Sequence, residues 1–179
     1  MSGMLPTHGG ETCSSETFRG DARSEVIRIG VVSDTHGLLR EEVLRRMQSC
    51  ARILHLGDVG DDAILDTLAE IAPVTAVRGN VDRAGRCAAL PETEMVEVGG
   101  VALYLLHDRE QLDLAPEAAG VAAVLSGHTH QPLIEWRRGV LYLNPGACGP
   151  KRFRLPVSCA WLDVEANGQL RPTLLTLAE

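Results

Sequence analysis

Aspartate, asparagine and histidine residues recur in this sequence directly after apolar stretches. They are Asp34, His36, Asp58, Asn80, His107, His128 and His130. Carboxylate oxygens, amide oxygens and imidazole nitrogens are the donors that divalent metals take in proteins. Two histidines that flank one threonine after a Ser-Gly bend are hard to explain by core packing. The pattern therefore favours a metal site.

Each fragment alone has a simpler explanation. Asp34 could begin a helix, and Asp58 and Asn80 each follow a glycine in sequences typical of turns. A histidine that ends a strand, such as His107, is often only hydrogen-bonded at the sheet edge. The occurrence of all these donors at strand ends favours a metal site, because ligands of open α/β sheets bind outside the carboxyl ends of the strands. We therefore interpret the residues as one site for divalent metal.

Apolar periodicity predicts the elements that would position these donors. In the first half we expect strands at 26–32, 52–56 and 74–77, with helices at 38–49 and 61–71. Strands that alternate with helices form a parallel sheet with right-handed crossovers. The donors at the ends of these strands should then lie along one edge of the sheet.

The second half of the sequence predicts mainly hairpins. Strand pairs are expected at 94–98 with 101–106, 133–136 with 140–143, and 157–164 with 170–177, together with a helix at 112–119 and a buried strand at 121–125. A parallel α/β half followed by hairpins predicts two sheets packed face to face, with helices over the outer faces. We expect one domain over residues 26–179 and a flexible N-terminal extension over residues 1–25, which lack any apolar period.

Composition narrows the class of function. The net charge of −7 makes non-specific nucleic-acid binding an unfavourable role. The five cysteines form no C-x-x-C pair, which favours a reducing compartment over a disulfide framework. No apolar run reaches the roughly 18–20 residues that span a bilayer, and no secretory signal is visible. We expect a soluble, cytoplasmic protein without a membrane partner.

The series Asp34-x-His36, Gly57-Asp58, Gly79-Asn80, His107 and Gly127-His128-x-His130 resembles the calcineurin-like metallophosphoesterase superfamily. The short length and Gly79-Asn80-Val81-Asp82 resemble its small single-domain phosphodiesterase branch. The resemblance spans roughly residues 26–178. It implies a four-layer α/β/β/α sandwich of two mixed sheets flanked by helices, with a dinuclear centre between the sheets.

The resemblance also implies a ligand set and a cofactor. One metal would be held by Asp34, His36, Asp58 and His130, and the other by Asp58, Asn80, His107 and His128. Asp58 would then be the bridge between two divalent ions, with manganese the favoured metal and iron, nickel or zinc as alternatives.

The mechanism implied is hydrolysis of a small phosphate ester. A hydroxide shared by the two metals would attack phosphorus in line, with Asp58, Asn80 and His128 as the catalytic residues. Many members of the superfamily carry a histidine where this chain has Val81, and that histidine protonates the leaving group. Valine cannot donate a proton, so phosphodiesters with good leaving groups are favoured, and Asp82 or a metal-bound water becomes the next candidate donor.

Other charged groups near the motifs have less specific patterns. Asp108-Arg109 follows His107 where relatives often carry glycine and another histidine. The arginines that flank the motif loops are Arg83, Arg86, Arg152 and Arg154, and one or two of them could clamp a phosphate. His8 and His55 are interpreted as non-ligands.

Other functions stay open at this stage. A non-catalytic protein-interaction scaffold could use the same fold, but a scaffold has no need to keep every ligand position filled, as this chain does. A mononuclear metal hydrolase or a metal sensor would need only part of the set. Within enzymes, a dinucleoside polyphosphate hydrolase or a protein phosphatase is a further alternative, and a homo-oligomer is compatible with the sequence.

Overall fold

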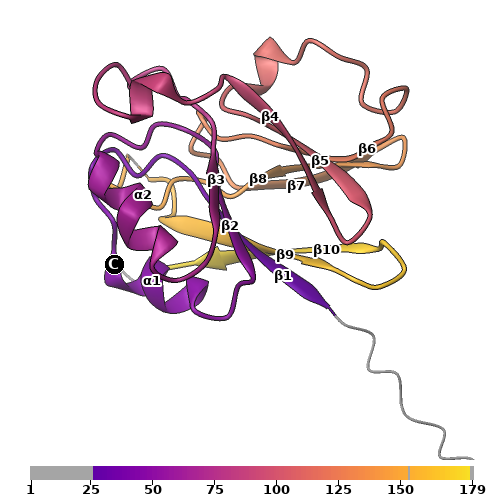
Figure 1. Ribbon diagram of the computed structural model, residues 1–179, viewed down its shortest axis with the longest axis horizontal. Coiled ribbons are helices and arrows are strands. Elements are labelled where there is room, and N and C mark those ends of the chain that lie inside the picture. The colour runs from indigo at the N-terminus through magenta and orange to yellow at the C-terminus, as the bar shows by residue number, and fades with distance from the viewer. Residues whose placement is uncertain (1–25, 153, 178–179) are drawn as a thin grey trace, which may run out of the picture.

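Two five-stranded sheets pack face to face in the computed structural model, which describes residues 26–152 and 154–177 (Figure 1). The extension predicted over residues 1–25, which includes His8, lies outside the described residues. Helices α1 (Glu41–Met47) and α2 (Asp62–Ala69) lie beside the first sheet.

The first sheet contains the predicted parallel unit. Its strands are β1 (Ile27–Val32), β2 (Arg52–His55), β3 (Val74–Ala76), β9 (Ser158–Val164) and β10 (Leu170–Thr176), in the order β10-β9-β1-β2-β3. β1 pairs in parallel with β2, and β2 pairs in parallel with β3. The predicted C-terminal hairpin, β9 with β10, continues the sheet antiparallel to β1. The first sheet is therefore mixed.

The second sheet is also mixed. Its strands are β4 (Thr93–Val98), β5 (Val101–Leu106), β6 (Val121–Leu125), β7 (Leu133–Arg137) and β8 (Val140–Asn144), in the order β4-β5-β6-β8-β7. β6 pairs in parallel with both β5 and β8, while β4 and β7 pair antiparallel at the two edges. Two short 3-10 helices, Cys87–Ala89 and Arg109–Gln111, lie in the connections.

Three apolar layers hold the sandwich together. The central layer joins the inner faces of the two sheets and includes Leu54 and Leu103, which are fully buried. A second layer lies between the first sheet and the helices, where Leu68 of α2 is buried. The third layer covers the outer face of the second sheet, where Leu112 packs against a cluster that contains Val124. This arrangement confirms the predicted four-layer sandwich of two mixed sheets, in which α1 and α2 form one outer layer and the 3-10 helix and turns after β5 form the other.

One predicted helix is absent from the structure, and another is shorter than predicted. The helix expected over 112–119 is absent, and that stretch forms turns after the 3-10 helix. Pro116 lacks a backbone N–H and disfavours helical backbone at Ala115 before it, so the helix cannot propagate. The helix expected over 38–49 is shorter, because Arg40 is extended, with φ of −81° and ψ of 143°, and α1 begins only after it.

Cys50, Cys87, Cys148 and Cys159 are free and buried. Burial raises the pKa of the Cys50 thiol to about 11 and that of the Cys87 thiol to about 12. These thiols therefore stay protonated at neutral pH. Within residues 26–152 and 154–177, no helix is long and apolar enough to cross a membrane.

Candidate metal centre

The donor residues follow the carboxyl ends of strands from both sheets. Asp34 and His36 follow β1, Asp58 follows β2, Asn80 follows β3, His107 follows β5, and His128 and His130 follow β6. The structure brings all seven residues into one continuous set of contacts. The two sheets therefore contribute jointly to one site, as the sequence predicted from strand ends.

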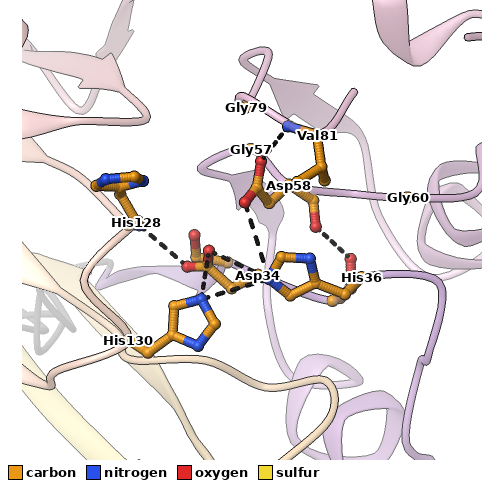
Figure 2. Close-up of polar contacts among 12 residues, drawn as sticks. Asp34, His36, Gly57, Asp58, Gly60, Gly79, Val81, His128 and His130 are labelled. Atoms are coloured by element: carbon orange, nitrogen blue, oxygen red, sulfur yellow. Dashed lines mark hydrogen bonds and ion pairs between the residues drawn. The ribbon is translucent and has the colours of Figure 1, made fainter. Parts of the chain in front are cut away.

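Asp34, His36, Asp58 and His130 form the first group of contacts (Figure 2). The Nε2 atom of His130 lies 3.2 Å from Asp34 Oδ1 and 3.3 Å from His36 Nε2. His36 Nε2 lies 3.8 Å from both Asp34 Oδ1 and Asp58 Oδ2. Asp34, His36 and His130 thus each place a donor atom within 4.8 Å of the other two, and Asp58 contacts this set through His36.

Asp58 also belongs to a second group of contacts, with Asn80, His107 and His128. Asp58 Oδ2 lies 3.4 Å from His107 Nε2. The amide oxygen of Asn80 lies 3.1 Å from His107 Nε2 and 3.1 Å from His128 Nδ1. Asp58 is therefore the side chain that joins the two groups.

The hydrogen bonds of His107 fix its tautomer. Its Nδ1 atom lies 2.7 Å from the carbonyl oxygen of Leu56 and must donate to it, since a carbonyl only accepts. Burial opposes the charged form, but the hydrogen bonds to Asp58 and Leu56 outweigh it and raise the pKa of His107. A metal at this site would displace the remaining proton from Nε2, which is the nitrogen that faces the other donors.

The ionisation of Asp58 suits a metal ligand. Burial opposes its ionisation, but hydrogen bonds from the His107 ring and from the backbone N–H of Val81 lower the pKa of Asp58. The Val81 N–H donates to Oδ1 over 3.0 Å, while Oδ2 faces the imidazoles. Asp58 is therefore a carboxylate at neutral pH, with one oxygen directed at both groups of donors.

The site passes a chemical test for a divalent metal. Asp34 Oδ1 and His130 Nδ1 are buried without a hydrogen-bond partner, an arrangement that costs free energy in a folded protein. Donors that share one metal at about 2.1 Å each lie about 3.0–3.4 Å apart. Several of the observed donor separations fall in this range. A cation would bind the unpaired Asp34 oxygen. It would also compensate the repulsion between neighbouring donor atoms, such as the two imidazole nitrogens of His36 and His130.

Five of the seven donor residues have left-handed backbone. Their φ angles are 56° at Asp34, 44° at His36, 55° at Asp58, 68° at His128 and 58° at His130. This conformation costs about 1–2 kcal/mol for a non-glycine residue. Backbone hydrogen bonds compensate part of that cost, since Asp34 N donates to Gly57 O over 3.1 Å and His36 N to Asp58 O over 2.9 Å. The strain is concentrated where the side chains must converge.

Two glycines allow the loops to approach one another closely. A Cβ atom at Gly79 would lie 2.1 Å from both the backbone nitrogen and Oδ1 of Asp58. A Cβ atom at Gly57, where φ is +90°, would lie 2.7 Å from His107 Nδ1. Glycine at both positions is therefore a steric requirement of the two donor groups.

A buried hydrogen-bond chain beneath the donors was missed in the sequence. Gly57 N donates to His55 Nδ1 over 3.3 Å, so His55 Nε2 carries the proton and donates to Thr35 Oγ1 over 2.9 Å. Thr35 Oγ1 in turn donates to Val59 O over 2.9 Å. Burial lowers the pKa of His55 to about 4, which keeps the ring neutral as this chain requires. His55 is thus a positioning residue between the β1 and β2 loops.

Asn144, the last residue of β8, supports the histidine loop. Its amide nitrogen donates to Gly127 O over 2.7 Å and to Thr129 Oγ1 over 3.1 Å, while its oxygen accepts from Gly146 N. The loop that carries His128 and His130 is therefore attached to the end of the neighbouring strand.

Two other carboxylates near the site have structural tasks. Asp82 is buried and accepts from Gly60 N and Gly79 N, one bond at each oxygen. It connects two site loops, so the role of proton donor considered for Asp82 does not fit the structure. Asp108 accepts from Glu110 N and begins the 3-10 helix after His107. This hydrogen bond is a structural role for Asp108 at the position where relatives often carry glycine.

The flanking arginines differ in their surroundings. Arg86 pairs with Asp66 and Asp62 of α2, so its charge is already neutralised. Arg152 lies near enough to His36 to oppose its protonation, although burial is the larger cause of the lowered pKa of His36. Arg83 lines a cavity beside the donors.

The family model of the calcineurin-like phosphoesterase superfamily domain matches residues 27–167 of this chain. The chain belongs to this superfamily. A protein of Methanocaldococcus jannaschii named probable metallophosphoesterase is 38% identical over 164 residues, which are 84% of this chain and 82% of the relative. A protein of the same organism named phosphodiesterase is 26% identical over 141 residues, which are 68% of this chain and 84% of the relative. Membership places the chain among metal-dependent phosphoester hydrolases.

Solved structures share the fold. Vacuolar Protein Sorting 29 from Cryptosporidium parvum has a TM-score of 0.69 at 17% identity, over 86% of this chain and 99% of that one. A protein described as a novel archaeal phosphodiesterase has a TM-score of 0.68 at 23% identity, over 83% of this chain and 100% of that one. At these identities the two structures establish a common architecture and nothing further.

The His55–Thr35 chain gives a testable effect on metal affinity. We expect Thr35→Val to weaken Mn²⁺ binding about tenfold, because groups that orient metal ligands contribute 10–100-fold to affinity. Thr35→Ser keeps the hydroxyl and should bind Mn²⁺ as the wild type does. Isothermal titration of the metal-free proteins measures both values. Equal affinity in all three proteins would show that the hydroxyl does not position the ligands.

Proposed function

We propose that this chain is a phosphodiesterase that uses two divalent metal ions, preferably Mn²⁺, held by the two groups of donors described above. The observation that carries the proposal is the position of Asp58, whose Oδ2 atom faces an imidazole of each group. A single carboxylate between two sets of donors is the arrangement of a bridged pair of metals. Two-metal sites of this kind are common in phosphoester hydrolases.

When bound, the metals would activate a water molecule and neutralise charge on the phosphoryl group. The chain's own residues orient the ester. His128 is exposed at the site, and both His128 and Asn80 line the adjacent cavity, so these side chains contact the phosphoryl group. The amide nitrogen of Asn80 donates to a phosphoryl oxygen, and such donors contribute most where charge develops in the transition state.

Phosphodiesters are favoured over alkyl phosphomonoesters because the site lacks an obvious proton donor for the leaving group. Val81 is 43% exposed beside Asp58 and cannot donate a proton from its side chain. Asp82 accepts hydrogen bonds at both oxygens. A leaving group that departs without protonation is therefore the preferred substrate, and the relative named phosphodiesterase is consistent with this choice.

A protein-interaction scaffold is the second candidate function. Ile134 and Trp136, two residues apart on the edge strand β7, are 37% and 52% exposed and place apolar surface on the same face of that strand. The neighbour Vacuolar Protein Sorting 29 is named for a role in protein sorting. Filled donor positions nevertheless favour the enzyme, since a scaffold has no need of buried, strained metal-type ligands.

The direct test is an assay of the Mn²⁺-loaded protein over phosphomonoesters, phosphodiesters and cyclic nucleotides. We expect turnover of bis(p-nitrophenyl) phosphate, and a loss of at least about 10³-fold in Asp58→Ala, because that change removes the link between the two donor groups. Met95→Ala, an exposed change on β4, is the control and should keep full activity. A panel without any turnover, or an active Asp58→Ala protein, would contradict the proposal.

Val81 gives a sharper test of the chemistry. Its hydrogen bond to Asp58 comes from the backbone N–H, so Val81→His can supply a general acid while that hydrogen bond remains. General acids contribute about 10²–10⁴-fold. We expect Val81→His to accelerate hydrolysis of alkyl diesters more than that of nitrophenyl diesters, measured as kcat across a series of leaving groups.

Val81→Ala is the matched control for that series and should keep the steep dependence on leaving group. Wild-type rates that are equal for alkyl and nitrophenyl diesters would mean that another group already donates the proton.

A further inference from the structure

A cavity of about 530 Å³ opens beside the second group of donors. Asn80, His107 and His128 form one part of its wall. The remainder comes from two segments. Residues 78–93 run from the end of β3 to the start of β4, and residues 106–113 begin at the last residue of β5. The volume lies within the roughly 300–1,000 Å³ typical of small-molecule sites. The cavity is therefore large enough for the organic group of an ester whose phosphorus lies at the metal centre.

Arg83 is the cavity's unneutralised cation. Its Nε atom donates to the backbone oxygen of Asn80 over 3.1 Å, which fixes the side chain beside a donor residue. Within residues 26–152 and 154–177 no carboxylate lies within ion-pair distance of Arg83. Arg78 differs, because Glu92 pairs with it inside the same cavity. A guanidinium held next to the metal donors is suited to a phosphoryl oxygen.

The wall farther along the β5 connection is rich in acceptors. Asp108 and Asp113 line the cavity, and both carry hydrogen bonds that fix their orientation: Gln111 donates to Asp108 over 3.2 Å, and Tyr104 donates to Asp113 over 2.8 Å. Ionised carboxylates only accept hydrogen bonds, and each retains free lone pairs here. A second anionic group would be repelled by this wall, whereas hydroxyl groups would be bound.

A cationic group fits less well than a hydroxyl-bearing one. The unpaired guanidinium of Arg83 lies in the same cavity and would repel an ammonium group held beside it. Among the described lining residues there is no Phe, Tyr or Trp ring to stabilise a quaternary ammonium. A neutral hydroxyl donor can bind the carboxylate wall without repulsion from Arg83.

We propose that the cavity recognises a neutral, hydroxyl-bearing organic group of about nucleoside size in a phosphodiester substrate. This inference rests on the proposed function. Asp113 and Asp108 accept hydrogen bonds from its hydroxyl groups, and Arg83 binds a phosphoryl oxygen. Asp113 and Arg83 are then specificity-determining and phosphate-binding residues, respectively.

The experiment compares two diesters with the same nitrophenolate leaving group: bis(p-nitrophenyl) phosphate and the p-nitrophenyl ester of thymidine 5′-phosphate. We expect the nucleoside ester to have the lower KM. Asp113→Ala should raise its KM about tenfold and leave that of bis(p-nitrophenyl) phosphate unchanged, since a hydrogen bond to a charged group contributes about that factor. Arg83→Gln should raise KM for both diesters.

Matched controls remove the same charges elsewhere. Glu97→Ala on β4 and Arg45→Gln on α1 change exposed residues and should leave both KM values at the wild-type level. A separate readout uses inhibition of bis(p-nitrophenyl) phosphate hydrolysis by free thymidine. Thymidine should inhibit competitively, 3′,5′-dideoxythymidine should inhibit less, and Asp113→Ala should remove the difference.

The outcomes separate the two proposals. No hydrolysis of either diester by the wild type would overturn the proposed function, and this inference with it. Hydrolysis with equal KM values, insensitive to Asp113→Ala, would overturn only the assignment of the cavity. Stronger inhibition by choline than by thymidine would also overturn it, because the wall would then select a cation.

Discussion

The pairing of β1 with β2 continues past the ends of both strands, and the site depends on that continuation. Backbone hydrogen bonds from Asp34 to Gly57 and from His36 to Asp58 hold the two loops together where regular strand geometry has ended. The donor residues take left-handed backbone there, so their side chains turn toward one another. Beneath them, the His55–Thr35 chain joins the same loops a second time.

The second sheet completes the site by docking against this pair of loops. His107 reaches the carbonyl of Leu56, directly after β2. His128 N donates to Asp34 Oδ2 over 3.2 Å (Figure 2). These contacts between sheets rest on the apolar layer that joins the two inner faces. Packing of leucine and valine in the core thus supports the separation of polar atoms at the edge.

The sequence predicted much of this arrangement because apolar periodicity and strand-end donors are local signals. Strand order along the chain, the parallel unit and the donor positions follow from such signals. The helix expected over 112–119 does not form because Pro116 lacks the backbone N–H that helix propagation needs. The hydrogen bonds of Thr35 to Val59 and of Asp82 to Gly60 could not be predicted from sequence, since these partners lie more than twenty residues apart.

The central claim is that the seven donors hold two divalent ions joined by Asp58. Metal analysis of the Mn²⁺-reconstituted protein, combined with electron paramagnetic resonance, tests it most directly. The account predicts two Mn²⁺ per chain with a spectrum of magnetically coupled ions, as expected for a pair about 3.5–4 Å apart. One ion per chain, or two ions without coupling, would contradict a shared site.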